Sequence, residues 1–208
     1  MECSSPTLSR HWGKEARLIP AFDDATGYIP PGRYSCTLQE VQDRLVLADE
    51  FTTSYTRNPL FAGLLTYVAH WQDTSDKLQS PSPLLRSFWI AGSFASSKVD
   101  PGDIDITPVI DGKLADEAHG KPGSKMIRKL TQHRDGIKQR YGLEVFPLRW
   151  YPVVQPHRAD ASLDGDQQAY LSDRGRLDDW WERCRIDGSD LPSIEGCDSR
   201  RGYLEVRL

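Results

Sequence analysis

The stretch that most constrains the fold of this chain covers residues 89–106 and reads WIAGSFASSKVDPGDIDI. An apolar run ends in Gly92 and Ser93, and after a spacer over residues 94–102 acidic and apolar residues alternate as DIDI. Alternation with a period of two predicts a strand with Asp103 and Asp105 on one face. We therefore expect two strands joined by a turn and a loop, with two carboxylates gathered beside the turn.

These residue types together favour one kind of site. Two carboxylates at i and i+2 on a strand repel each other and raise the pKa of one of them unless a cation neutralises the pair. Divalent cations such as Mg²⁺ bind carboxylate oxygens. Gly92 permits close backbone approach, and Ser93 offers a hydroxyl and an N–H that suit phosphate oxygens. The combination predicts a site for a metal ion and a triphosphate.

The rest of the chain predicts a small α+β domain, in which a mixed sheet is flanked by helices. Thr37 and Glu40 form a capping-box pattern that predicts a helix start, and an apolar stripe follows. Further helices are expected over 58–72, over the basic stretch 123–142 and around 176–184, and strands over 86–92, 103–111, 143–151 and 202–208.

We expect one domain over residues 1–208, because this length suits a single core. Its expected parts are an extended N-terminal lead-in (1–36), a helical segment (37–80), a catalytic core (85–150) and a C-terminal extension that returns to the sheet (151–208).

Composition narrows the class of protein. The formal net charge is −4 and the pI is about 5.7. Proteins dedicated to nucleic-acid binding are usually basic, so the net charge disfavours a large nucleic-acid-binding surface. The sequence has no apolar run of membrane-spanning length and no signal-peptide core, so we expect a cytoplasmic protein with no membrane partner. Metal-finger spacing is absent from the cysteines, so we expect free thiols at Cys3, Cys36, Cys184 and Cys197.

The opening stretch resembles the signature of the nucleotidyltransferase superfamily that includes DNA polymerase beta. In that signature an apolar residue, Gly, and Gly or Ser precede an acid–apolar–acid–apolar run, and here it covers roughly one fifth of the chain. The segments IPPGRY, YGLEVFPL and RGYLEVRL extend the resemblance to bacterial minimal nucleotidyltransferases. Some of those relatives, such as the AbiE and MenT toxins, belong to toxin–antitoxin or phage-defence systems.

The resemblance implies a nucleotidyltransferase fold and a role for each matched residue. Gly92 and Ser93 would hold the β- and γ-phosphates of an NTP, and Asp103 and Asp105 would ligate Mg²⁺. The superfamily has a third carboxylate on a neighbouring strand, which Glu144 matches, although relatives more often carry Asp there. Two ions would then clamp the attack of an acceptor hydroxyl on the α-phosphate as pyrophosphate leaves. Glu144 would help to bind the ion that activates the hydroxyl and could take its proton.

The basic stretch 123–142 has two interpretations. It is either a solvated helix face, or Lys125 or Lys129 contacts the triphosphate while its other basic residues meet an RNA backbone. Ser124 at the expected helix start could also donate to a phosphate.

Two further features have structural interpretations. Asp111 competes with Glu144 as the third acid, but it ends the DIDI strand before Gly112, so we expect a turn residue. We expect the pair Trp180–Trp181 to anchor the core rather than to stack on a base.

The resemblance and the basic stretch imply transfer of NMP from an NTP to RNA, with a tRNA 3′ end as acceptor, by a toxin or defence protein, and whether a cognate antitoxin is its partner stays open. AMPylation-type modification of a protein partner stays open, as does a catalytically inactive nucleotide-binding or antitoxin-like module. The position of Glu144 relative to Asp103 and Asp105 distinguishes the catalytic from the inactive interpretation.

Overall fold

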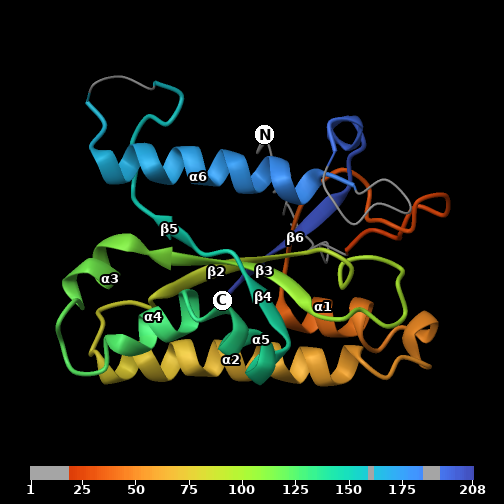
Figure 1. Ribbon diagram of the computed structural model, residues 1–208, viewed down its shortest axis with the longest axis horizontal. Helices are drawn as coiled ribbons and strands as arrows, with labels where there is room; N and C mark the ends of the chain where they lie inside the picture. Colours follow the sequence, from red (N-terminus) through yellow and green to blue (C-terminus); the bar gives the residue numbers. More distant parts are fainter. Residues whose placement is uncertain (1–18, 159–161, 185–192) are drawn as a thin grey trace, which may run out of the picture.

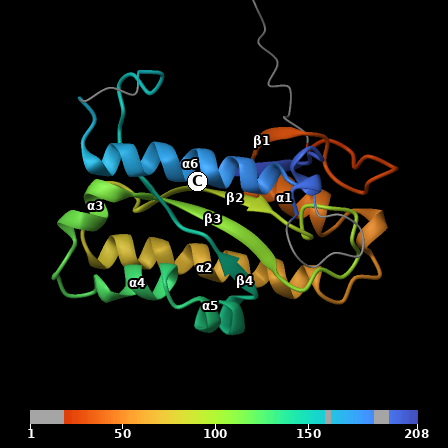
Figure 2. The same cartoon turned by 45° about the horizontal axis from the view of Figure 1, so that its top comes forward.

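Helices cover both faces of one mixed β-sheet in the computed structural model, which describes residues 19–158, 162–184 and 193–208. Helix α6 (Gly165–Glu182) lies across one face, and α2 (Arg57–Lys77) lies on the other (Figure 1). The turned view keeps the same three layers apart (Figure 2). The chain is therefore an α+β protein, as its sequence predicts.

In the described residues the sheet has six strands in the order β1-β6-β2-β3-β4, and β5 also pairs with β3. Strand β2 runs antiparallel to β3 and β6, whereas the pairs β1–β6, β3–β4 and β3–β5 are parallel. The strands are β1 (Gly32–Cys36), β2 (Leu85–Ala91), β3 (Ile104–Asp111), β4 (Leu143–Val145), β5 (Leu148–Trp150) and β6 (Gly202–Arg207).

The remaining helices are short. They are α1 (Leu38–Leu45), α3 (Gly112–Glu117), α4 (Lys125–Thr131) and α5 (Arg134–Tyr141), with 3₁₀ turns at Asp49–Phe51 and Glu195–Cys197. The capping box expected at the start of α1 is confirmed. Thr37 Oγ1 accepts from Glu40 N at 3.2 Å, and the Glu40 carboxylate accepts from Thr37 N at 2.6 Å.

The two faces of the sheet bury separate apolar clusters. On the α2 face, Leu64, Tyr67 and Trp71 pack against strand residues such as Ile90 and Ile106. On the α6 face, the aromatic side chains of Trp89, Trp181 and Tyr203 dominate the cluster. Because side chains alternate along a strand, the residues of β3 at 105, 107 and 109 all lie on the α6 face.

Trp181 anchors α6 to the sheet, as expected, whereas the same expectation is wrong for Trp180, which is 36% exposed and lines a pocket. Trp181 is 2% exposed, and its Nε1 donates a hydrogen bond of 2.8 Å to the buried Thr107 Oγ1. A buried indole usually finds such a partner. Helix α6 is much longer than the short helix expected around 176–184, because a second capping box formed by Asp164 and Gln167 starts it earlier.

The expectation of one continuous basic helix over 123–142 is wrong. Its residues form α4 and α5, which are separated at His133, where φ is −85° and ψ is 63°. That ψ is not helical, so the ladder of backbone hydrogen bonds is interrupted there. Gly142 ends α5 with a φ of 68°, in the left-handed region, as expected for a glycine that closes a helix.

The strand expected over 143–151 is also divided. Pro147 separates β4 from β5, because proline has no N–H to donate to the ladder. Both halves still pair in parallel with β3. At the N-terminal side, Gly32–Cys36 forms β1 against β6, where the sequence predicts only an extended lead-in, and residues 1–18 of that lead-in lie outside the described residues.

The structure bears on two expectations, the lack of a membrane-spanning helix and the free cysteines. Among the described residues, no helix has the length and apolar character needed to cross a membrane. Cys36, Cys184 and Cys197 are free thiols, as expected, and Cys3 lies outside the described ranges.

Candidate active site

The turn after β2 brings backbone and carboxylate together. Gly92 has φ 68°, a conformation that side chains rarely adopt, and a Cβ placed on it would overlap the carboxylate of Asp105. The antiparallel register pairs Asp105 with Ala91, the last residue of β2. Glycine is therefore required at this position, because only a residue without a side chain lets the carboxylate lie against the turn.

Three acidic residues predicted from the sequence lie at one end of two adjacent strands. In the parallel pair β3–β4, Asp105 stands opposite Glu144, and Asp103 lies two residues before Asp105. The side chains of Asp103 and Glu144 are 19% and 34% exposed, so both remain accessible to a ligand. The structure thus brings Asp103, Asp105 and Glu144 to the same site, together with Gly92 and Ser93.

Helix α5 supplies the cations that face these acids. Lys138 Nζ lies 2.7 Å from Asp103 Oδ2 and 3.4 Å from Glu144 Oε2. Arg134 Nη2 lies 3.0 Å from Glu144 Oε1. The hydrogen bond to Asp103 raises the pKa of Lys138, although partial burial opposes this. Lys138 therefore bridges the carboxylate of Asp103, which directly precedes β3, and that of Glu144 on β4.

The donor types fit a divalent cation, but their spacing fits it only in part. Carboxylate oxygens are the ligands that Mg²⁺ prefers. Because Gly92 has no side chain, the carboxylate of Asp105 can lie against the turn. Within the described ranges, however, no group of three or more His, Cys, Asp or Glu side chains is close enough to hold a metal ion. In the observed geometry, Asp103 and Glu144 instead pair with Lys138.

The acids line a pocket of about 810 Å³ under the C-terminal end of α6. One wall is the loop after the Gly-Ser turn, which contributes Ser96, Ser97 and Lys98. A second wall is the loop at Thr26–Tyr28, and the two loops are joined by a bond of 2.8 Å from Ser97 N to Gly27 O. The remaining wall comes from the end of α6 and from residues near the C-terminus.

Arg57 fixes the loop after the Gly-Ser turn, and sequence reasoning missed it. Its guanidinium is fully buried and donates to the carbonyl oxygens of Phe94, Ser96 and Lys98 at 2.6–2.9 Å. It also donates to the carbonyls of Leu45 and Val99, and its charged group lies 3.6 Å from the centre of the Phe51 ring. Burial lowers the pKa of Arg57 to about 10. No motif in the sequence marks this arginine.

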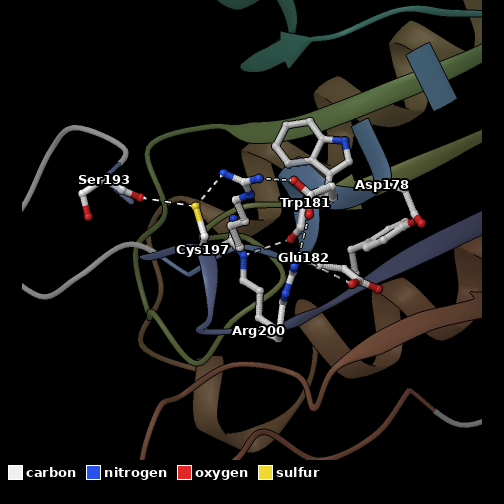
Figure 3. A network of polar contacts seen from close by, with 10 residues as sticks. Asp178, Trp181, Glu182, Ser193, Cys197 and Arg200 are labelled. Carbon is white, nitrogen blue, oxygen red and sulfur yellow. Dashed lines mark hydrogen bonds and ion pairs between the residues drawn. The ribbon is translucent and has the colours of Figure 1, made fainter. Parts of the chain in front are cut away.

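Hydrogen bonds tie the C-terminal wall of the pocket to α6. Arg183 and Arg200 both donate to the carboxylate of Asp179, and Arg200 does so at 2.9 Å. Arg183 also donates to Cys197 Sγ at 3.0 Å, and Figure 3 shows Cys197 between this network and Ser193. Asp179 and Arg183 lie in the helix expected around 176–184, but no sequence pattern indicates their contacts with Cys197 and Arg200.

Three predicted residues lie elsewhere. Ser124, Lys125 and Lys129 belong to the start and middle of α4, which packs against α2, and none of them lines the pocket. The basic residues that reach the carboxylates come instead from α5. Asp111 caps α3 by accepting from Leu114 N at 3.1 Å, in agreement with its interpretation as a turn residue.

Comparison with known proteins gives one match. Residues 20–207 match a family described as a family of unknown function, DUF6932. No curated protein and no solved structure matches the chain significantly. Because the family match spans most of the 208 residues, the chain belongs to the DUF6932 family.

Proposed function

We propose that this protein is a metal-dependent nucleotidyltransferase, which transfers NMP from an NTP to an acceptor hydroxyl. The observation that carries the proposal is the pairing of Asp105 with Glu144 across β3 and β4, beside a turn that only glycine permits. Asp103 adds a third carboxylate at the same strand end. This arrangement agrees with the superfamily signature at the residues that would carry the chemistry.

The pocket supports a substrate of nucleotide size. Its volume of about 810 Å³ lies within the range usual for ligand sites. Lys98, Arg183 and Arg201 line it, so cationic groups face the space that a triphosphate would occupy. Trp180 also lines it and offers an aromatic surface for a base.

Each residue of the site has a role in the proposed reaction. The backbone and hydroxyl at Gly92–Ser93 would bind phosphate oxygens, and Asp103, Asp105 and Glu144 would hold a divalent cation. A bound divalent cation supplies charge neutralisation at the transferring phosphate. The acceptor hydroxyl forms a bond to the α-phosphorus, the bond to the bridging oxygen of pyrophosphate breaks, and Glu144 accepts the hydroxyl proton. Positioning of the two substrates provides most of the remaining rate enhancement.

We favour an RNA 3′ end, such as that of a tRNA, as the acceptor. The basic side chains of α5 lie beside the carboxylates, and α4 extends the basic surface with Lys125, Arg128 and Lys129. Phosphate contacts of this kind position an RNA without reading its sequence. In this proposal the protein acts as a toxin or defence enzyme, and AMPylation of a protein partner is the alternative acceptor chemistry.

A second candidate function follows from Lys138. Its ammonium bridges Asp103 and Glu144 and so neutralises these acids without a metal ion. A catalytically inactive nucleotide-binding or antitoxin-like module needs no metal ion, so this arrangement suits it. Transfer activity distinguishes the two candidates, because only the enzyme incorporates label into an acceptor.

The test is incubation of the purified protein with Mg²⁺, each of the four α-labelled NTPs in turn, and total tRNA or cell lysate, followed by gel electrophoresis. Label on RNA that disappears with Asp105→Asn and persists with Asp73→Asn supports the proposal. Asp73 is a matched control because it is an exposed acid on α2 that pairs only with Lys77. Label on protein supports AMPylation, and nucleotide binding without any label supports the binding module.

A further inference from the structure

A second pocket, of about 350 Å³, lies on the α6 face of the sheet at the strand ends opposite the carboxylates. Its walls come from the start of β2, the end of β6, β5 and the first half of α6. Its volume is at the lower end of the range for ligand sites. None of its lining residues lines the pocket of the candidate active site.

Trp89 contributes a buried indole to the wall of this second pocket. The residue lines the pocket and is 2% exposed. Its Nε1 is buried and has no hydrogen-bond partner in the part of the chain that the structure describes. The indole therefore lies in the wall of the pocket, where its N–H signal can report what binds there.

Three arginines, Arg86, Arg174 and Arg207, line the second pocket. The guanidinium of Arg86 stacks 3.7 Å from the centre of the Trp150 ring. Arg86 also pairs with Asp111, which does not line the pocket. Arg207 lies 3.6 Å from Glu205.

Arg174 is the least compensated of the three arginines. Its Nη1 donates to the Tyr170 hydroxyl at 3.1 Å, and no carboxylate of the described residues pairs with it. Glu205 is the acid of the lining, and it already lies 3.8 Å from Arg33. The guanidiniums of the lining thus outnumber its carboxylates.

We propose that the second pocket binds a small aromatic anion, whose carboxylate or phosphate group is held by Arg174 and Arg86. Arg–oxyanion pairs are strong because the guanidinium offers two parallel N–H donors. Trp89 lines the same pocket, and Val109, Leu148 and Trp150 provide the apolar surface for the ring. This site does not depend on the proposed nucleotide transfer.

The test follows the indole N–H signals of the ¹⁵N-labelled full chain, which has 6 tryptophans, without Mg²⁺ or nucleotide. Comparison with Trp89→Phe identifies the Trp89 signal. The probes are phenyl phosphate, benzoate and, as a neutral control, benzyl alcohol. We expect the Trp89 signal to shift and to saturate below about 10 mM with at least one anion. The anion that saturates first identifies the charged group.

Matched variants on one helix separate the proposed contact from general charge. Arg174→Gln should weaken binding of the anion about tenfold, as loss of a charged hydrogen-bond partner does. Arg176→Gln should leave binding unchanged, because Arg176 pairs with Asp173 on the surface and does not line the pocket. The other indole signals show whether each variant is folded. If Arg174→Gln does not fold, Arg86→Gln replaces it, and it should likewise weaken binding of the anion.

Three results would overturn the inference. They are the absence of a saturable shift at Trp89 with either anion, equal binding of benzyl alcohol, and unchanged binding in both folded variants at Arg174 and Arg86. Because the measurement contains no NTP, its failure leaves the proposed transferase activity untouched, and loss of transferase activity leaves this site untouched.

Discussion

The carboxylate of Asp105 occupies the space in which a side chain at Gly92 would begin. The two residues come from adjacent antiparallel strands, so the strand register and the glycine together set how closely the acid approaches the turn. The proposed phosphate-binding turn and the proposed metal ligand are thus one steric unit, and a change to either should affect both.

Replacement of Gly92 by alanine should destabilise the protein by about 1–2 kcal/mol and reduce activity strongly. The reasons are the positive φ of 68° and the overlap with Asp105. Gly175→Ala is the matched control, because Gly175 lies in α6 with open space around it and should gain about 1 kcal/mol in helix propensity. Urea unfolding measures both effects. Equal stability of Gly92→Ala and the wild type would contradict the steric argument.

Arg57→Met should cost about 3 kcal/mol or more, because it leaves buried carbonyl oxygens without their charged donor. The loop at 94–99 would lose its fixed shape, so transfer activity should fall even where the variant remains folded. Arg44→Met serves as the control, since Arg44 pairs with Glu50 and stacks on Phe22, where its contacts are with side chains and not with the loop at 94–99. Denaturant midpoints and proteolysis within the loop would report the effect, and similar midpoints for the two variants would exclude a central role for Arg57.

Removal of Lys138 should make the carboxylates more available to a cation. Without Mg²⁺, Lys138→Gln should lose less than about 1 kcal/mol, because the ion pair is largely exposed. With Mg²⁺, the rise in melting temperature should be larger in Lys138→Gln than in the wild type, since the ion no longer competes with the ammonium.

Lys125→Gln, on α4 and away from the pocket, should respond to Mg²⁺ as the wild type does. An Mg²⁺ effect that is the same in both lysine variants would mean that the ion binds elsewhere.

Asp179 should make the stability of the protein depend on pH in the acid range. Hydrogen bonds from Arg200 and Arg183 lower the pKa of Asp179 below its usual 3.8. The stabilisation is therefore fully present above pH 3.8 and is lost as the pH falls through the lower, folded-state pKa. The difference in melting temperature between the wild type and Asp179→Asn should be constant from about pH 7 to 5 and shrink below about pH 4.

Asp173→Asn tests whether that profile is specific. Asp173 pairs with Arg176 on the same helix but does not tie α6 to the C-terminal segment. Its melting-temperature difference from the wild type should be small at each pH, and a profile equal to that of Asp179→Asn would show that the acid effect is general.

The sequence predicted the elements whose signals are local. Alternation at 103–106 identified β3, and the pair Thr37 and Glu40 identified the start of α1. The three acids and the Gly-Ser turn meet because strand pairing needs only the neighbouring strands. The α+β class followed from the order of these elements.

Features that depend on distant residues were not predictable in the same way. Arg57 acts on a loop about forty residues later, and nothing in its own neighbourhood signals a buried guanidinium. The break at His133 and the strand β1 were missed because α5 and β1 are set by what they pack against, and not by their own propensity. The C-terminal wall of the pocket likewise depends on tertiary contacts.

The place of β6 in the sheet has a consequence for synthesis of the protein. This strand covers residues 202–207, yet it lies between β1 and β2, which precede it by more than a hundred residues. On the ribosome, β1 cannot reach its place beside the rest of the sheet until Gly202–Arg207 has left the exit tunnel. Until then this edge of β2 lacks its partner, and an unpaired strand edge is a template for association with other chains.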